Sequence, residues 1–453
     1  MEKEQFIGIV EGILLPLFTG SKIVGEEEST ARDSEVAQGA SGTVLIKPYK
    51  QDEYRLIVKR NQPFKSNEVS IIKSIMSELI KVSEFNITEP TYLKRMQTTA
   101  IEKAICNSLS ETASETLLGL INALGHWVDR TYEGRRTSFG IVLNESTSIQ
   151  NKMDNLKYSS VLQSDFSALL SDGRLSCLEF DKDGYIMGHL IMERIRYAPT
   201  LCPYDFINFA RLCNEKRIGI ALLESGDMLL FKNRELMFAR RRGVWNSYSH
   251  EEIIQLLSNR SSHTIKEIRR AIYYTALDVS FSGCGGCIVY LNKDKSEQAL
   301  SHINAYDILS EKHYEIKREM EKEEAGKLYN LDNPDYEEVV NNDFSAFIQS
   351  SNCVKSATIL KIIGNKKFHE LNRKLREELV AMDGATIVDY DGTIIATGAI
   401  IKIEAGSKAG GRLAATKTLA RYGVAIKISQ DGIIQGYTYD KKAFKARNVF
   451  SVG

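Results

Sequence analysis

The residues best suited to chemistry lie in the segment from Met382 to Tyr437. Asp383-Gly384-Ala385 stands where a predicted helix gives way to a predicted strand, and Gly398-Ala399 comes at the end of the following strand. A glycine lets the backbone approach a ligand closely, and the carboxylate beside it supplies negative charge. The pattern therefore indicates a ligand-binding turn around Asp383.

A glycine-rich segment, Ala405–Arg412, follows and opens onto a predicted helix. Such a segment exposes backbone N–H groups, and the N-terminus of the helix adds a positive partial charge. Lys408 and Arg412 supply formal charge for phosphate oxygens. These features favour a phosphate-binding loop. Composition alone leaves an ordinary turn between helix and strand as the alternative, with Asp383 only capping a strand.

The order of these motifs resembles that of the diadenylate cyclases. The matching residues are Asp383-Gly384-Ala385, Gly398-Ala399, Gly410-Gly411-Arg412 and Ile426–Gly432. The upstream segment Ile265–Asp294 is similar to the first helix, glycine-led strand and turn of that family. The resemblance spans about residues 260–440, with an enlarged insertion at about residues 293–354.

The resemblance implies a nucleotidyltransferase that condenses two ATP molecules into cyclic di-AMP and releases pyrophosphate. Asp383 would activate the ribose 3′-hydroxyl and hold a divalent cation, Mg²⁺ or Mn²⁺. One domain holds one ATP, so two copies must meet face to face in a homodimer or a larger homo-oligomer. The expected nucleotide-binding residues are Gly384, Ala385, Gly398, Ala399, Lys408, Gly411, Arg412, Thr416 and Ser429.

The phosphate motif departs from the family pattern. The family carries Arg-His-Arg, whereas this chain reads Gly411-Arg412-Leu413-Ala414 and keeps only the first arginine. Charge-assisted hydrogen bonds are worth about 1.5–3 kcal/mol each, so losing two such side chains matters unless Lys408 or Lys417 replaces them. The alternative function is therefore a catalytically weak or inactive receptor for a nucleotide or cyclic dinucleotide, with the same fold.

The elements expected around these residues predict an α/β domain over residues 260–445, with a mixed central sheet flanked by helices. Apolar residues recur at helical spacing over residues 265–276, and a strand is expected over 287–291. Two further helix–strand units follow, over residues 367–390 and 411–429. Asp391-Gly392 and Asp431-Gly432 are typical of hairpin turns.

The preceding region, residues 1–255, is predicted to be an α+β sensor-like or regulatory region for an unknown effector. It forms one unit or two subdomains with a break near residues 90–130. A charged loop is expected over residues 25–42. His126-Trp127 and Thr131–Arg136 resemble a signature in sensor regions attached to some diadenylate cyclases; a structural aromatic cluster at a helix end is the alternative.

Composition limits the classes of partner. The chain has 453 residues, of which 43% are hydrophobic, and its 59 basic residues balance its 59 acidic residues. A neutral chain lacks the basic surplus of a general nucleic-acid binder. No apolar run reaches the roughly 18 residues that a membrane span needs. Seven scattered cysteines predict reduced thiols in a cytoplasmic protein, and Cys284–Cys287 has no second pair at zinc spacing.

Overall fold

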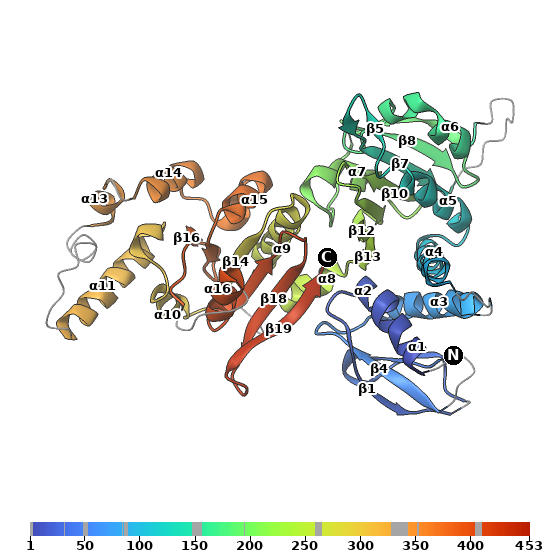
Figure 1. Cartoon of the computed structure of the whole chain (residues 1–453). Coiled ribbons are helices and arrows are strands. Elements are labelled where there is room, and N and C mark those ends of the chain that lie inside the picture. Colours follow the sequence, from blue (N-terminus) through green and yellow to red (C-terminus); the bar gives the residue numbers. More distant parts are fainter. Residues whose placement is uncertain are drawn as a thin grey trace. The chain divides into compact units, whose positions relative to one another are not determined.

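The computed structural model describes residues 3–30, 32–48, 53–83, 85, 89–146, 156–193, 195–258, 265–327, 343–350, 353–403 and 410–453. The chain divides into two units, Met1–Ser249 with Val452–Gly453, and His250–Ser451 (Figure 1). The sequence placed this boundary at residues 255–260. It lies earlier because helix α8 (His250–Leu256) packs against helix α9 (Lys266–Phe281) of the second unit. His250 Nδ1 lies 2.7 Å from the hydroxyl of Tyr273.

The N-terminal unit begins with a helical segment whose apolar residues face inward. Phe6, Val10, Leu14 and Leu17 recur at helical spacing and are at most 1% exposed. A four-stranded sheet of order β1-β4-β3-β2 follows. The elements are α1 (Lys3–Ile9), a π-helical turn (Val10–Leu14), α2 (Leu15–Leu17), β1 (Lys22–Glu28), β2 (Val36–Gln38), β3 (Val44–Ile46), β4 (Tyr54–Lys59), α3 (Ser66–Ser83), α4 (Pro90–Leu109) and α5 (Ser114–Gly125). The expected loop over residues 25–42 is wrong at two places, because the end of β1 covers residues 25–28 and β2 covers Val36–Gln38.

A seven-stranded sheet completes this unit, in the order β13-β12-β11-β10-β7-β8-β9. β7 and β8 are parallel, and the neighbouring pairs are antiparallel. The elements are β5 (Thr131–Tyr132), β6 (Arg135–Arg136), β7 (Phe139–Asn144), α6 (Tyr158–Gln163), β8 (Ser176–Asp181), β9 (Ile186–Ile191), α7 (Ile207–Leu212), β10 (Arg217–Leu222), β11 (Met228–Lys232), β12 (Glu235–Arg241) and β13 (Val244–Ser247). One cluster of buried apolar residues extends from Phe6 to Trp245, so residues on both sides of 90–130 share a core.

The C-terminal unit is built on a six-stranded mixed sheet of order β16-β15-β14-β17-β18-β19. β14 runs parallel to β15 and antiparallel to β17, while β15–β16 and β17–β18 are antiparallel pairs. The elements are β14 (Gly286–Leu291), α15 (Arg373–Ala381), β15 (Ala385–Val388), β16 (Ile394–Ala399), α16 (Gly411–Leu419), β17 (Gly423–Ile428), β18 (Ile434–Asp440) and β19 (Lys445–Val452). The predicted α/β class, a mixed sheet flanked by helices, is confirmed.

Successive residues of β14 point to opposite faces of the sheet, which places the helices. A Cβ on Gly286 would lie 2.9 Å from the Val380 side chain of α15, whereas Cys287 Sγ lies 3.3 Å from the Thr416 hydroxyl of α16. Helices α15 and α16 therefore cover opposite faces. α9 packs beside α15, and the two are joined by a bidentate pair in which the Arg373 guanidinium lies 2.6 and 2.7 Å from the two carboxylate oxygens of Asp278.

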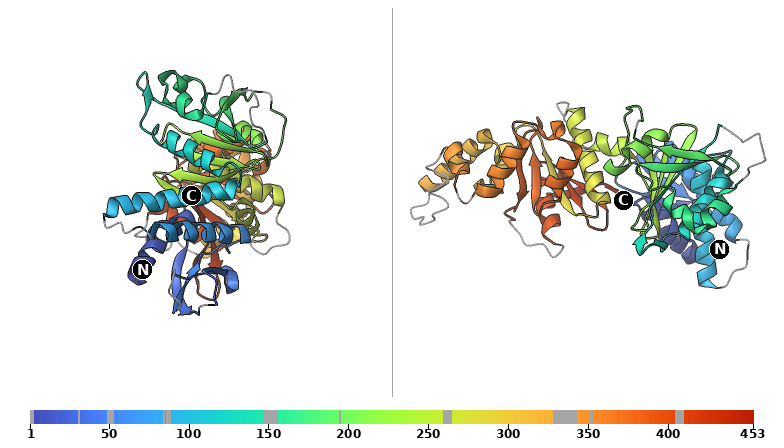
Figure 2. Two further views of the ribbon diagram at one scale, coloured as in Figure 1. Left: turned by 90° about the vertical axis from the view of Figure 1, so that its right-hand side faces the viewer. Right: turned by 90° about the horizontal axis from the view of Figure 1, so that it is seen from above.

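Between β14 and α15 the chain forms helices beyond the β16 edge of the sheet (Figures 1 and 2). They are α10 (Ser296–Leu300), α11 (Glu311–Lys327), α13 (Phe344–Ile348) and α14 (Val354–Ile363). His313 of α11 is buried with its Nε2 3.3 Å from Asp389, and the Ser296 hydroxyl donates to that carboxylate at 2.7 Å. Burial alone would raise the pKa of Asp389, but hydrogen bonds from His313 and Ser296 hold it below its ordinary value.

None of the seven cysteines, all of which lie in the described part of the chain, forms a disulfide bond. Burial raises the pKa of the Cys287 thiol to about 11, so this thiol stays protonated at neutral pH and is a poor nucleophile. Within the residues that the structure describes, no helix is both long and apolar enough to cross a membrane.

Candidate nucleotide-binding site

The Asp383-Gly384-Ala385 turn packs backbone against backbone on the end of β16. Gly384 has φ of +109°, and a Cβ there would lie 2.5 Å from the carbonyl carbon of Gly398 and 2.7 Å from the carbonyl oxygens of Gly398 and Ala399. Gly398 itself has φ of +57°. Only glycine combines this dihedral with so close an approach. The turn therefore requires both glycines that the sequence singled out.

Two threonines fix the strands beneath this turn to the end of α15. The hydroxyls of Thr386 and Thr397 lie 2.8 Å apart, and Thr397 donates to the Leu379 carbonyl at 2.9 Å. That bond satisfies a carbonyl near the C-terminus of α15 that the helix itself leaves unpaired. Ala385 and Ala399, both buried, are paired across the two strands, whose register shifts just after Ala385. Such irregular pairing is common next to active sites.

Asp383 projects from this turn into solvent. Its side chain is 89% exposed, and one carboxylate oxygen lies 3.8 Å from the Arg412 guanidinium. The separation is longer than a hydrogen bond, so the two charges face one another without direct bonding. Two residues that the sequence linked through a family resemblance are thus neighbours in space.

Arg412 lies in the first turn of α16 and reaches across the loop before β14. A Cβ on Gly285 would lie 2.4 Å from one guanidinium nitrogen, so that glycine makes room for the arginine. The Nε of Arg412 is buried and has no hydrogen-bond partner among the described residues. A buried unpaired donor is costly, and its position marks a place for an acceptor.

The N-terminus of α16 adds further donors beside Arg412. Gly410, with φ of +88°, precedes the helix, and no side chain caps the first turn in the part of the chain that the structure describes. Among the described residues, which leave out 404–409, no atom would lie within 4 Å of a Cβ added to Gly410 or Gly411, so these residues leave the backbone here uncovered. Uncapped N–H groups and the helix dipole favour an anion at this position.

Lys355 of α14 is a functional candidate that the sequence reasoning missed. Its ammonium group donates to the Gly398 carbonyl at 2.9 Å and forms an ion pair with Asp307. The side chain is 40% exposed, so it keeps access to solvent and to a ligand. Lys355 lies 28 residues before Asp383 and in none of the motifs of the candidate site, so the sequence gives no local signal for this placement.

Of the other predicted residues, Ser429 borders the site, whereas Thr416 is part of the buried structure that holds α16. Ser429 follows Ile428, whose carbonyl oxygen lies close to Gly285, so the residue borders the Arg412 side of the site. Thr416 is fully buried, and its hydroxyl bonds the Arg412 carbonyl at 2.7 Å, so the expectation that it contacts nucleotide is corrected to a supporting role within α16. Lys408 lies outside the described residues.

His302 forms hydrogen bonds both to the segment before residues 404–409 and to the segment after them. Its backbone carbonyl accepts from the Lys402 amide at 2.9 Å, and its ring nitrogens lie 2.9 Å from the Lys402 carbonyl and 2.9 Å from the Tyr422 hydroxyl. Lys402 follows β16 and Tyr422 follows α16. This buried histidine therefore fixes the distance between the strand that carries Gly398 and the helix that carries Arg412.

The donor set near Asp383 fits a magnesium or manganese ion only in part. Among the described residues, no three His, Cys, Asp or Glu side chains gather as a complete metal site. Mg²⁺ usually keeps several waters and binds through one or two carboxylates together with substrate phosphates. Asp383 supplies one such exposed carboxylate, so the residues fit a cation that arrives with a triphosphate.

No family model, no curated protein and no solved structure matches this chain. The geometry gathers an exposed carboxylate, a guanidinium with an unpaired donor, an ammonium group and an open helix N-terminus around a turn that needs glycine. Such a group of residues is suited to binding a polyphosphate and to accepting a proton beside it.

Proposed function

We propose that the C-terminal unit binds ATP and that two copies of the chain condense two ATP molecules into cyclic di-AMP. The observation that supports this most strongly is Arg412, whose guanidinium lies 3.8 Å from the exposed Asp383 and whose buried Nε has no hydrogen-bond partner among the described residues. The order of the motifs in the sequence and the closeness of Asp383 to Arg412 both support this proposal. The N-terminal unit would regulate the reaction.

In this proposal the triphosphate binds between the N-terminus of α16 and the turn at Gly384. The first-turn amides of α16 and the Arg412 guanidinium donate to phosphate oxygens, and the Lys355 ammonium group adds charge from the opposite side. The open space over Gly410 and Gly411 lets the phosphates approach the backbone. Lys355 would partly replace the cations missing from the motif after Arg412.

Asp383 would take the proton of the ribose 3′-hydroxyl. The hydroxyl oxygen then forms a bond to the α-phosphorus of the ATP held by the facing copy, the bond from that phosphorus to the bridging oxygen breaks, and pyrophosphate leaves. A second condensation, in which the 3′-hydroxyl of the second ATP attacks the α-phosphorus of the first, closes the ring. Two ATP molecules therefore yield one cyclic di-AMP and two pyrophosphates. The 89% exposure of Asp383 makes its carboxylate accessible to a second copy. A bound Mg²⁺ or Mn²⁺ would neutralise charge on the leaving pyrophosphate.

The second candidate is a nucleotide receptor without turnover. It is favoured by the position of Arg412, the single arginine left in the motif, which faces Asp383 itself. In a receptor the same pair would orient a bound nucleotide and report it to a partner.

The experiment is incubation of the purified chain with ATP and either Mg²⁺ or Mn²⁺, followed by chromatography for cyclic di-AMP and an assay for pyrophosphate. Condensation predicts both products in a ratio of one to two. Saturable ATP binding without either product, across both metals, selects the receptor. Failure to bind ATP at all contradicts both candidates.

A further inference from the structure

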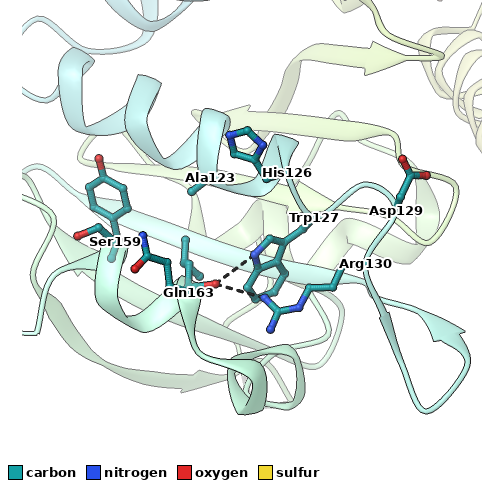
Figure 3. A pocket seen from close by; sticks show the side chains of 9 residues that line it. Ala123, His126, Trp127, Asp129, Arg130, Ser159 and Gln163 are labelled. Atoms are coloured by element: carbon teal, nitrogen blue, oxygen red, sulfur yellow. Dashed lines mark hydrogen bonds between the residues drawn. The ribbon is translucent and has the colours of Figure 1, made fainter.

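The N-terminal unit contains a cavity that none of the chemistry above uses. It lies between the C-terminal end of α5 and the short helix α6 and has a volume of about 600 Å³ (Figure 3). Small-molecule sites usually span about 300–1,000 Å³. The lining residues are Ala123, His126, Trp127, Asp129, Arg130, Tyr158, Ser159, Leu162 and Gln163.

Hydrogen bonds fix the positions of the Trp127 and Arg130 side chains at the base of this cavity. The Trp127 indole N–H and the Arg130 guanidinium both donate to the Leu162 carbonyl at 3.2 Å (Figure 3). The Arg130 guanidinium also donates to the Ser164 carbonyl at 3.0 Å. The guanidinium also lies 4.2 Å from the centre of the Trp127 ring. Side chains fixed before binding lose little entropy when a ligand arrives.

Tyr158 forms a second aromatic wall. Its side chain packs against α5 at Gly119, where an added Cβ would lie 2.0 Å from the tyrosine hydroxyl oxygen. The residue is anchored by its amide, which donates to the Gly184 carbonyl at 2.9 Å. The absence of a side chain at Gly119 is therefore what lets the tyrosine ring take this position.

The rim carries polar side chains with unused hydrogen-bonding capacity. Within the described residues, the side chains of His126, Tyr158, Ser159 and Gln163 make no hydrogen bond to protein. His126, Ser159 and Gln163 are exposed, and Tyr158 is half-buried. Together these groups offer both donors and acceptors, as a hydroxyl, an amide and an imidazole do. The lining holds one acidic residue, the exposed Asp129, and one basic residue, Arg130, so its formal charges sum to zero when His126 is neutral. Arg130 itself pairs with Asp165 at 3.4 Å, and Asp129 pairs with Arg136 at 3.9 Å.

We propose that this cavity is a regulatory site for an uncharged planar nitrogen heterocycle, in the form of a free nucleobase or nucleoside. Trp127 is only 5% exposed and the Arg130 guanidinium lies over its ring, so the planes open to a base are those of Arg130 and of the half-buried Tyr158. Bases stack on such planes, and the mixed rim matches their alternating ring donors and acceptors. The neutral lining disfavours a phosphorylated ligand. The assignment is independent of ATP condensation in the C-terminal unit.

The test is titration of the full-length chain with adenosine, guanosine, cytidine and uridine, followed by tryptophan emission and by calorimetry. Both tryptophans of the chain, Trp127 and Trp245, lie in the N-terminal unit, so emission reports on that unit alone. We expect saturable binding of at least one nucleoside, and weaker binding of its monophosphate. No response to any of the four at about 1 mM, or tighter binding of the monophosphate, overturns the assignment.

Two variants locate the binding. Ala123→Leu fills the cavity and should abolish the response, while Gln163→Ala removes one rim hydrogen bond and should weaken binding about fivefold. Gln5→Ala changes an exposed glutamine on α1 of the same unit and should leave the dissociation constant unchanged. Because Gln163 is exposed, its variant tests the site even if Ala123→Leu fails to fold. Nucleoside binding that Gln163→Ala leaves unchanged places the ligand elsewhere and refutes the proposal.

Discussion

Replacing Gly384 with alanine tests the turn on which the candidate site depends. The backbone there has φ of +109°, and the new Cβ would lie 2.5 Å from the Gly398 carbonyl carbon. Holding a side chain at such a dihedral costs about 1–3 kcal/mol. Because the opposing atoms belong to backbone, relief of the overlap costs about another 1–3 kcal/mol. We expect Gly384→Ala to destabilise the C-terminal unit by about 2–6 kcal/mol.

The assay is thermal unfolding with hydrogen exchange on peptides of β15 and β16. A loss of this size lowers the melting temperature of a unit of about 200 residues by about 10 °C. Tryptophan emission should melt as in wild type, because both indoles lie in the N-terminal unit.

Gly411→Ala is the matched control. A Cβ at Gly411 meets no atom within 4 Å, and the residue lies in α16, where alanine is favoured over glycine by about 0.5–1 kcal/mol. Stability should stay the same or rise slightly. Equal melting and exchange in the Gly384 and Gly411 variants would refute the close backbone packing of the turn.

Three further predictions concern single side chains. Gly285→Ala should displace the Arg412 guanidinium and weaken ATP binding several-fold with little change in melting temperature; unchanged affinity would contradict that placement. Lys355→Met should also weaken ATP binding, measured by calorimetry, and a wild-type dissociation constant would exclude Lys355 from the site. Asp389→Asn should cost about 1–3 kcal/mol at pH 7, measured by urea unfolding. The folded pKa of Asp389 lies below the ordinary 3.8, so its stabilisation is present above that pH and disappears as the pH falls through the folded value. A difference from wild type that does not shrink as the pH falls below 3.8 would contradict this linkage.

Local signals predicted the elements around the site well. Asp391-Gly392 and Asp431-Gly432 were expected at hairpin turns, and both glycines have positive φ between paired strands. The helix expected from residue 411 begins at Gly411, because the glycines before it suit an open N-terminus. Such features depend on residues that are close together in the chain, so they can be predicted from the local sequence.

Features set by distant pairing were missed. Residues 25–28 were expected in a loop, but they end the edge strand β1, whose backbone pairs with β4. Glu26 and Glu28 are exposed, and Glu27 forms an ion pair with Arg55 of β4. Lys355 lies at the site because its helix, α14, packs close to Gly398. Thr416 lies away from the site because its side chain is buried between α16 and β14. None of these placements follows from local periodicity.

The most direct test of the proposed reaction compares wild type with Asp383→Asn under single-turnover conditions, with ATP binding measured in parallel. Asp431→Asn, which changes another exposed aspartate of the same unit, is the control. We predict that wild type and Asp431→Asn form cyclic di-AMP, while Asp383→Asn binds ATP but forms none. Equal rates of cyclic di-AMP formation by wild type and Asp383→Asn would contradict the role of Asp383 as the base.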